Sequence, residues 1–175
     1  MAVIEAIQTT YLEANASSVT FSSIPQTYEH LQLRYTLTLA AISNTYQRLW
    51  LGDGSADTGT TYSYHVIYAH DSSAGVWKGT GESNGIYLGQ APGNSNRAWT
   101  SPTIVDIFDY VNTNKNTTVQ VFNFDGGDST STADYVTFAS GLWDSTAAVD
   151  TILINNRYGN NFLRGSEFSL YGIQE

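Results

Sequence analysis

The sequence predicts an all-β fold, an antiparallel β-sandwich of jelly-roll-like type with about ten short strands. Two observations predict it. Apolar and polar residues alternate along several segments, which is the period of a half-buried strand. Turn-forming Gly, Asn, Asp and Ser separate these segments at short intervals. With 175 residues the chain has the length of one domain, and we expect a single β-sandwich over residues 1–175.

The clearest strand is His30–Leu39, where Leu31, Leu33, Tyr35 and further leucines alternate with polar residues. Other segments carry the β-branched and aromatic residues that favour strands. These expected strands are Ser18–Phe21, Gln47–Leu51, Tyr62–Ala69, Gly85–Leu88, Thr117–Phe124, Tyr135–Leu142, Thr151–Asn155 and Glu167–Gly172. Turns are expected at Gly52–Ser55, Asp71–Gly75, Pro92–Asn94, Asn112–Asn116 and Asp125–Asp128.

Ser101–Val111 fits two structures. Ser101 and Pro102 would serve as the N-cap and first residue of a helix, and the following apolar residues have helical spacing. The segment is also rich in β-branched and aromatic residues and leads through an Asn-rich turn into another expected strand. We therefore predict a strand over Thr103–Val111.

Composition restricts the partners. Only 13% of the residues are charged, and the formal net charge is −9. The excess negative charge opposes binding to a phosphate backbone, so we expect no nucleic-acid partner. No apolar run reaches the ~20 residues of a membrane span and the first residues are not basic, so we expect no membrane partner and no export signal. The chain has no cysteine, which excludes disulfides and thiolate chemistry.

Few residues suggest a metal or a cofactor, and we expect neither. His65 and His70 are five residues apart, which on a strand places them on opposite faces and prevents joint metal binding; His30 is the third histidine. Two acidic loops offer oxygen ligands for calcium, but Asp is also a common turn residue. Their carboxylates belong to Asp53 and Asp57, and to Asp125, Asp128 and Asp134.

No catalytic arrangement is recognisable, and we expect no enzyme. The chain has no G-x-S-x-G segment, and no spacing pairs two carboxylates as glycoside hydrolysis requires. Binding of other molecules is the expected class of function.

Aromatic residues gather between positions 62 and 99 among Asn, Ser and Gly. They suit either a protein contact or stacking on a sugar, whereas strand alternation would send about half of them into the core. The candidate interface or ligand-binding residues are Tyr62, Tyr64, Trp77, Tyr87 and Trp99, with Tyr68 in the same segment.

Several segments resemble a known family. They are VTFSSIP at Val19–Pro25, YEHLQLRYTL at Tyr28–Leu37, TYSY at Thr61–Tyr64 and GSEFSLYGI at Gly165–Ile173. Together they resemble the small jelly-roll structural proteins of tailed bacteriophages, over nearly the whole chain. Leu31, Leu33, Phe168 and Leu170 are then expected in the core, and Gly172 at the end of the last strand.

The resemblance implies a virion component that is assembled in the host cytoplasm. The favoured role is a capsid decoration, or cement, protein that binds the major capsid protein or other virion proteins. The alternative is a tail fibre or baseplate module that binds a host receptor or glycan. The family supplies no catalytic residues. We expect a homodimer or homotrimer, since closed symmetric oligomers are the default and capsid sites are themselves symmetric.

Overall fold

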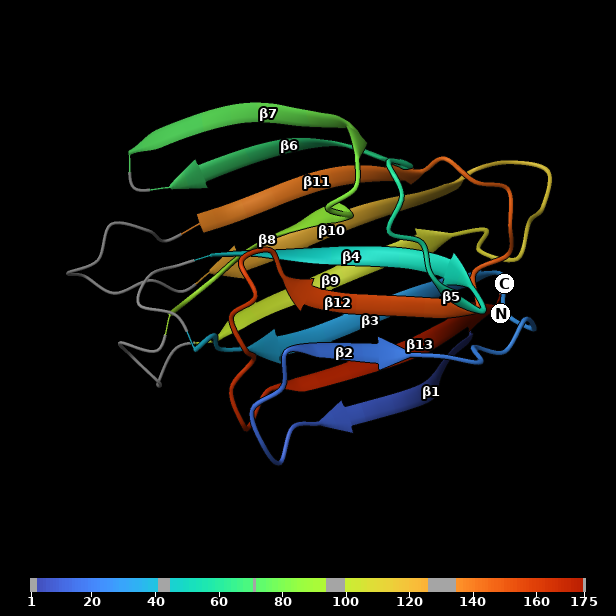
Figure 1. Ribbon diagram of the computed structural model, residues 1–175, viewed down its shortest axis with the longest axis horizontal. Coiled ribbons are helices and arrows are strands. Elements are labelled where there is room, and N and C mark those ends of the chain that lie inside the picture. The colour runs from blue at the N-terminus through green and yellow to red at the C-terminus, as the bar shows by residue number, and fades with distance from the viewer. Residues whose placement is uncertain (1–2, 41–44, 71, 94–99, 126–134, 175) are drawn as a thin grey trace.

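A computed structural model describes residues 3–40, 45–70, 72–93, 100–125 and 135–174, and these form an all-β sandwich of two antiparallel sheets (Figure 1). The predicted fold class is confirmed. None of the described residues belongs to a helix that could cross a membrane. The two termini lie near each other at one end of the sandwich (Figure 1).

The larger sheet has eight strands. In spatial order they are β1 (Val3–Tyr11), β13 (Glu167–Gln174), β3 (His30–Leu37), β9 (Ser101–Phe108), β10 (Thr117–Asp125), β11 (Tyr135–Trp143), β6 (Tyr62–His70) and β7 (Ser73–Glu82). The smaller sheet is β2 (Ser18–Phe21), β12 (Thr151–Asn156), β4 (Thr45–Asp53) and β8 (Ile86–Ala91), with β5 (Ser55–Ala56) folded back on the end of β4. The chain crosses repeatedly between the sheets, as in a jelly roll.

Strand alternation separates the core from the outer face of the large sheet. Leu31, Leu33, Tyr35 and Leu37 of β3 point into the sandwich, and the polar residues between them point outward. Phe168 and Leu170 are buried on β13, as predicted. In contrast, every residue of β8 is buried, because this strand contacts β6, β9, β10 and β11 of the large sheet.

The segment that fits both a helix and a strand is a strand. β9 pairs with β3 on one side and with β10 on the other. Ser101, Thr103, Val105 and Ile107 are buried in alternation with more exposed neighbours. The period of two therefore outweighs the helical spacing of the same residues.

Three strands escaped the sequence analysis: the two-residue β5, which falls partly in an expected turn, and the two long strands β1 and β7. β1 is an edge strand that is mostly exposed, so its residues need no alternation. β7 is rich in glycine, which normally weakens a strand. Its glycines are required here: a Cβ on Gly75 would lie 2.5 Å from the Tyr68 hydroxyl oxygen, and one on Gly79 would lie 2.5 Å from Cζ of Tyr64. The expected turn at Asp71–Gly75 is also shorter, because Ser73 already pairs with His70.

The prediction that Gly172 marks the end of the last strand is wrong. β13 continues through Gln174, and Gly172 pairs with Leu31 and Glu5 in the middle of the sheet. The glycine has a packing role, because a Cβ at this position would lie 2.2 Å from Cγ of Tyr28. The ring of Tyr28 occupies the space that a side chain would need.

We predict that Gly172→Ala lowers the free energy of unfolding by about 1–3 kcal/mol, the usual effect of overpacking. Urea unfolding followed by tryptophan fluorescence measures this. In a Tyr28→Ala background the ring is absent, so the same change should have a much smaller effect. An equal effect in both backgrounds would show that the ring is not the cause.

Candidate functional site

The most unusual surface inside the sandwich lies where β6 and β7 extend beyond the edge of the small sheet (Figure 1). Their inward rings contact rings from β4 and β8. Trp77 lies 4.8 Å from Tyr87 and 5.6 Å from Tyr64 between ring centroids, both in edge-to-face geometry. Tyr46 of β4 lies 5.4 Å from Tyr87 and 6.1 Å from Trp77.

A second ring group lies at the ends of β6 and β11. His70 stacks on Tyr135 at 4.7 Å and on Tyr68 at 5.8 Å, and the two tyrosines are 5.9 Å apart. The two groups line a hollow of about 180 Å³. We call it the aromatic pocket, and its lining residues are Tyr46, Tyr68, Trp77, Tyr87, Gln90 and Tyr135.

A buried cation lies behind this pocket. Arg48 of β4 has no exposed surface, and its Cζ atom lies 5.1 Å from the centroid of Tyr64 and 5.3 Å from that of Tyr87. None of its three guanidinium nitrogens donates a hydrogen bond to another described residue. The two ring faces are therefore its main electrostatic partners, and they compensate only part of the desolvation of a buried charge.

The residues predicted as surface contacts have different positions. Tyr62 and Tyr64 are in the core with 0% and 3% of their surface exposed, so the contact interpretation is wrong for them. They face inward because both occupy the core-facing register of β6. Tyr87 is also buried but lines the aromatic pocket, as does the half-buried Trp77. Trp99 lies outside the described residues.

The pocket also contains residues that sequence reasoning missed, namely Tyr46 and Tyr135, with Arg48 behind them. They lie outside the aromatic segment 62–99. They join it only because β4 pairs with β8 and β11 pairs with β6. No local signal in the sequence indicates this pairing.

The opposite, outer face of the large sheet carries an exposed apolar row. Directly paired residues on five adjacent strands form it, and Phe122 and Phe138 lie 4.8 Å apart between ring centroids. The apolar row is Ile104, Phe122, Phe138, Ile67 and Val76, with 38%, 42%, 51%, 64% and 75% of their surface exposed. Phe124 and Val136 pair beside it. A shallow hollow of about 650 Å³ adjoins Ile67 and Phe138.

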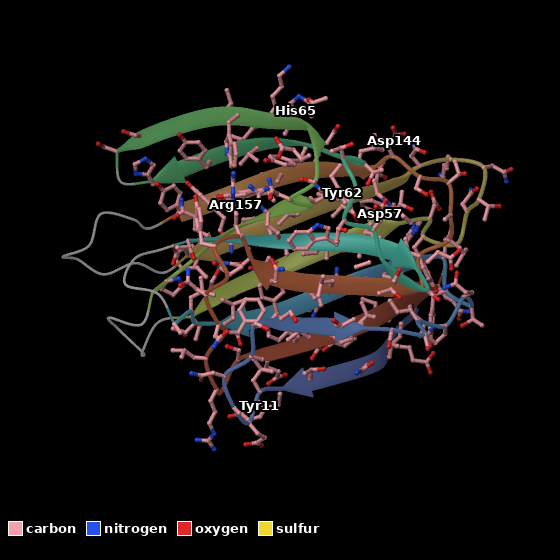
Figure 2. All side chains as sticks on the ribbon, in the orientation of Figure 1. Tyr11, Asp57, Tyr62, His65, Asp144 and Arg157 are labelled. Atoms are coloured by element: carbon pink, nitrogen blue, oxygen red, sulfur yellow. The ribbon has the colours of Figure 1, made fainter. Side chains whose placement is uncertain are left out.

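The histidines do not form a shared site. His65 points outward from β6 (Figure 2), whereas His70 lies on the other face and stacks on Tyr68 and Tyr135, as strand alternation predicted. His30 lies near the carboxylates of Glu29 and Asp109, in a group whose ligand atoms lie within 4.8 Å of one another. Lys115 forms an ion pair with Asp109, and the backbone N–H of Asp109 donates to His30 Nδ1 at 3.0 Å. His30 and Asp109 therefore already have protein partners.

The acidic loop at Asp57 is held by internal hydrogen bonds. The indole N–H of Trp143 donates to its carboxylate at 2.9 Å, the backbone N–H of Gly59 at 2.8 Å and the Thr61 hydroxyl at 2.8 Å. The nearby Tyr62 hydroxyl donates to the carbonyl of Asp57 at 2.8 Å (Figure 2). These hydrogen bonds therefore explain the presence of Asp57 in this loop as that of a turn residue. In the other loop Asp125 is buried, and Asp128 and Asp134 lie outside the described residues.

These contacts predict a pH-dependent contribution to stability. The hydrogen bond from Trp143 is the main reason why the pKa of Asp57 is lower than its ordinary value of 3.8, although burial acts in the opposite direction. A carboxyl with a lower pKa in the folded state stabilises the fold at neutral pH, and this contribution is lost as the pH falls through the folded-state pKa. We expect Asp57→Asn to lower the free energy of unfolding by about 1 kcal/mol at pH 7, and we expect this deficit to be smaller at about pH 2.

Urea unfolding at the two pH values tests the role of Asp57. Asp53→Asn is the matched control, because Asp53 is exposed in the same loop, and it should change stability little at either pH. A deficit of Asp57→Asn that persists undiminished at low pH would contradict the assignment to the charged carboxylate.

The buried cation makes a second prediction. Replacing Arg48 with Met keeps much of the packing volume and removes a desolvated charge, so we expect Arg48→Met to raise the free energy of unfolding by about 1–3 kcal/mol. Arg34→Met is the control: Arg34 is exposed, 5.4 Å from the ring of Tyr171, and should change stability little. Urea unfolding distinguishes the two. A marked loss of stability in Arg48→Met would show that the rings compensate the charge fully.

Comparisons with known proteins give little further information. No family model matches the chain, and no curated protein matches it. Xylan β-1,4-xylosidase from Bacillus halodurans C-125 is 10% identical with a TM-score of 0.32, over 84% of this chain and 28% of the xylosidase. The exoplasmic/lumenal domain of VIP36, in its Ca²⁺/Man2-bound form, is 9% identical with a TM-score of 0.27, over 98% of this chain and 80% of that domain. Similarities this low carry no argument about function.

Proposed function

We propose that this chain is a virion structural protein, a decoration protein that binds the assembled capsid through the outer face of its large sheet. The apolar row carries the proposal. Exposed apolar patches of this kind mark protein interaction sites in soluble proteins. The resemblance to phage jelly-roll proteins supports the choice of the capsid as the partner.

The row has the geometry of a docking surface. It crosses five adjacent strands, which is about 20 Å at the usual strand spacing. Its residues are fixed by paired strands rather than by loops, so little conformational entropy would be lost on binding. The neighbouring outward residues include Gln120, Ser140 and His65, which give the apolar row a polar border.

A decoration protein that binds only the assembled capsid stabilises that state by mass action. The proposal therefore requires binding and no catalysis. The major capsid protein is the proposed partner, and a dimer or trimer of this chain remains the expected oligomer. The alternative is a tail fibre or baseplate module that binds a host receptor or glycan.

We expect the purified protein to bind undecorated capsids and to give regular density at symmetric positions in cryo-electron microscopy. The double variant Phe122→Ser/Phe138→Ser should bind capsids at least about tenfold more weakly, because aromatic residues dominate binding energies. Both side chains lie on the outer face and are 42% and 51% exposed, so the thermal unfolding of the variant should change much less than its capsid binding.

Tyr11→Ser is the matched control, because Tyr11 lies on β1, far from the row, and is 51% exposed (Figure 2). It should bind capsids as the wild type does. Binding to isolated tails but not to capsids would move the protein to the tail. Capsid binding that survives the double change would reject the apolar row as the docking surface.

A further inference from the structure

The aromatic pocket has the size of a small ligand. Its volume of about 180 Å³ corresponds to roughly six water molecules, which is close to the volume of one six-membered sugar ring. Its walls come from β4 and β8 of the small sheet and from β6, β7 and β11 of the large sheet. A pocket built on five paired strands of two sheets is preformed.

The lining combines ring faces with hydroxyl groups. The pKa of the Tyr87 hydroxyl is raised. Burial is the largest cause, and the nearby hydroxyls of Tyr46 and Tyr135 raise it further. Tyr135 also contributes to the raised pKa of Tyr46, after burial and Tyr158. The three phenol groups therefore lie close together in the pocket wall. The hydroxyls of Tyr46 and Tyr135 form no hydrogen bond with another described residue, and the amide of Gln90 lies in the same lining.

These groups match the chemistry of a pyranose ring. A pyranose has C–H faces that pack against aromatic rings, and hydroxyls at its rim that need donors and acceptors. Half-buried Trp77, Tyr46, Tyr68 and Tyr135 offer ring surface to such a ligand. Phenol hydroxyls and an amide can both donate and accept. An apolar wall with a few convergent polar groups is the usual composition of a small-molecule site.

A quaternary ammonium ion is the chemical rival, because aromatic-lined pockets also bind such cations. Arg48 argues against it. The guanidinium already lies on the rings of Tyr64 and Tyr87, and Tyr87 is itself part of the pocket wall. Its charge has no ion-pair partner among the described residues, so it opposes a second cation nearby and favours an anion.

We propose that the aromatic pocket binds one pyranose ring of a saccharide, and that it prefers a ring bearing a carboxylate to a ring bearing an amine. The pocket lies on the inner side of β6 and β7, whereas the apolar row lies on their outer side. Saccharide binding therefore does not rest on the proposed capsid docking, and either function can fail without the other.

The test uses the whole protein and an array of neutral, uronate-bearing and amine-bearing oligosaccharides, followed by calorimetry with the strongest member. We expect saturable binding to at least one pyranose, with uronates bound more tightly than their amine-bearing counterparts. Trp77→Ala should weaken binding at least about tenfold, as expected for loss of an aromatic anchor. Tyr46→Phe keeps the ring and should weaken binding severalfold through loss of its hydroxyl.

Two controls separate binding from folding. Tyr11→Ala removes an aromatic side chain that is more exposed than Trp77 and lies on β1, far from the pocket, so it should bind as the wild type does. Trp77→Phe keeps a ring in place, so its fold should be retained, as shown by circular dichroism and thermal unfolding, while its affinity falls. Arg48→Met should reduce the preference for uronates over amines.

Three outcomes would overturn the proposal. The first is an array on which the protein shows saturable binding to no pyranose. The second is a bound saccharide whose affinity is unchanged in folded Trp77→Phe and Tyr46→Phe. The third is saturable binding of choline that displaces the saccharide, which would make the pocket a cation site. Capsid binding by the Phe122→Ser/Phe138→Ser variant is measured separately, so it cannot be mistaken for any of these.

Discussion

The structure depends on a mismatch in width between its two sheets. The large sheet has eight strands, whereas the small sheet has four principal strands, so at the usual spacing the sheets are about 34 and 14 Å wide between their outer strand axes. The inner face of the large sheet is apolar, so leaving its excess width uncovered would expose apolar surface to water, which is unfavourable. At one edge the rings of Tyr46, Tyr64, Trp77 and Tyr87 fill the space that a further strand of the small sheet would cover.

This mismatch also explains why a pocket exists. Aromatic side chains are large and rigid, and their edge-to-face contacts leave gaps that flexible aliphatic chains would fill. No strand of the small sheet lies over β6 and β7 at this edge (Figure 1), and Tyr46 and Trp77 there are only partly buried. The same location allows β4 to carry Arg48, whose charge interacts with ring faces instead of an acidic partner. A close-packed strand in that position would leave no space for either feature.

The sequence predicts those strands in which the polarity of each residue matches its own burial or exposure. The β-branched and aromatic residues of Thr103–Val111 predicted a strand, which the structure places at Ser101–Phe108. Alternation along His30–Leu39 predicted a strand with one buried face. It failed for β1, where both faces are largely exposed, and for β7, whose glycines serve rings on the neighbouring strand. The pocket was only partly predictable. Trp77 and Tyr87 belong to a visible aromatic segment, whereas Tyr46 and Tyr135 reach them through strand pairing between distant segments.

One strand register positions both the aromatic pocket and the apolar row. On β6, Tyr64 and Tyr68 point inward and Ile67 points outward, so the strand contributes to the core, the pocket and the apolar row together. The partner residues on β7 are Gly79 and Gly75 opposite the tyrosines, and Val76 opposite Ile67. A slip of one residue would place a tyrosine ring over a residue with a Cβ, in space that only glycine leaves free. The steric fit between tyrosine and glycine inside the sandwich therefore fixes the alignment of Ile67 with Val76 outside it.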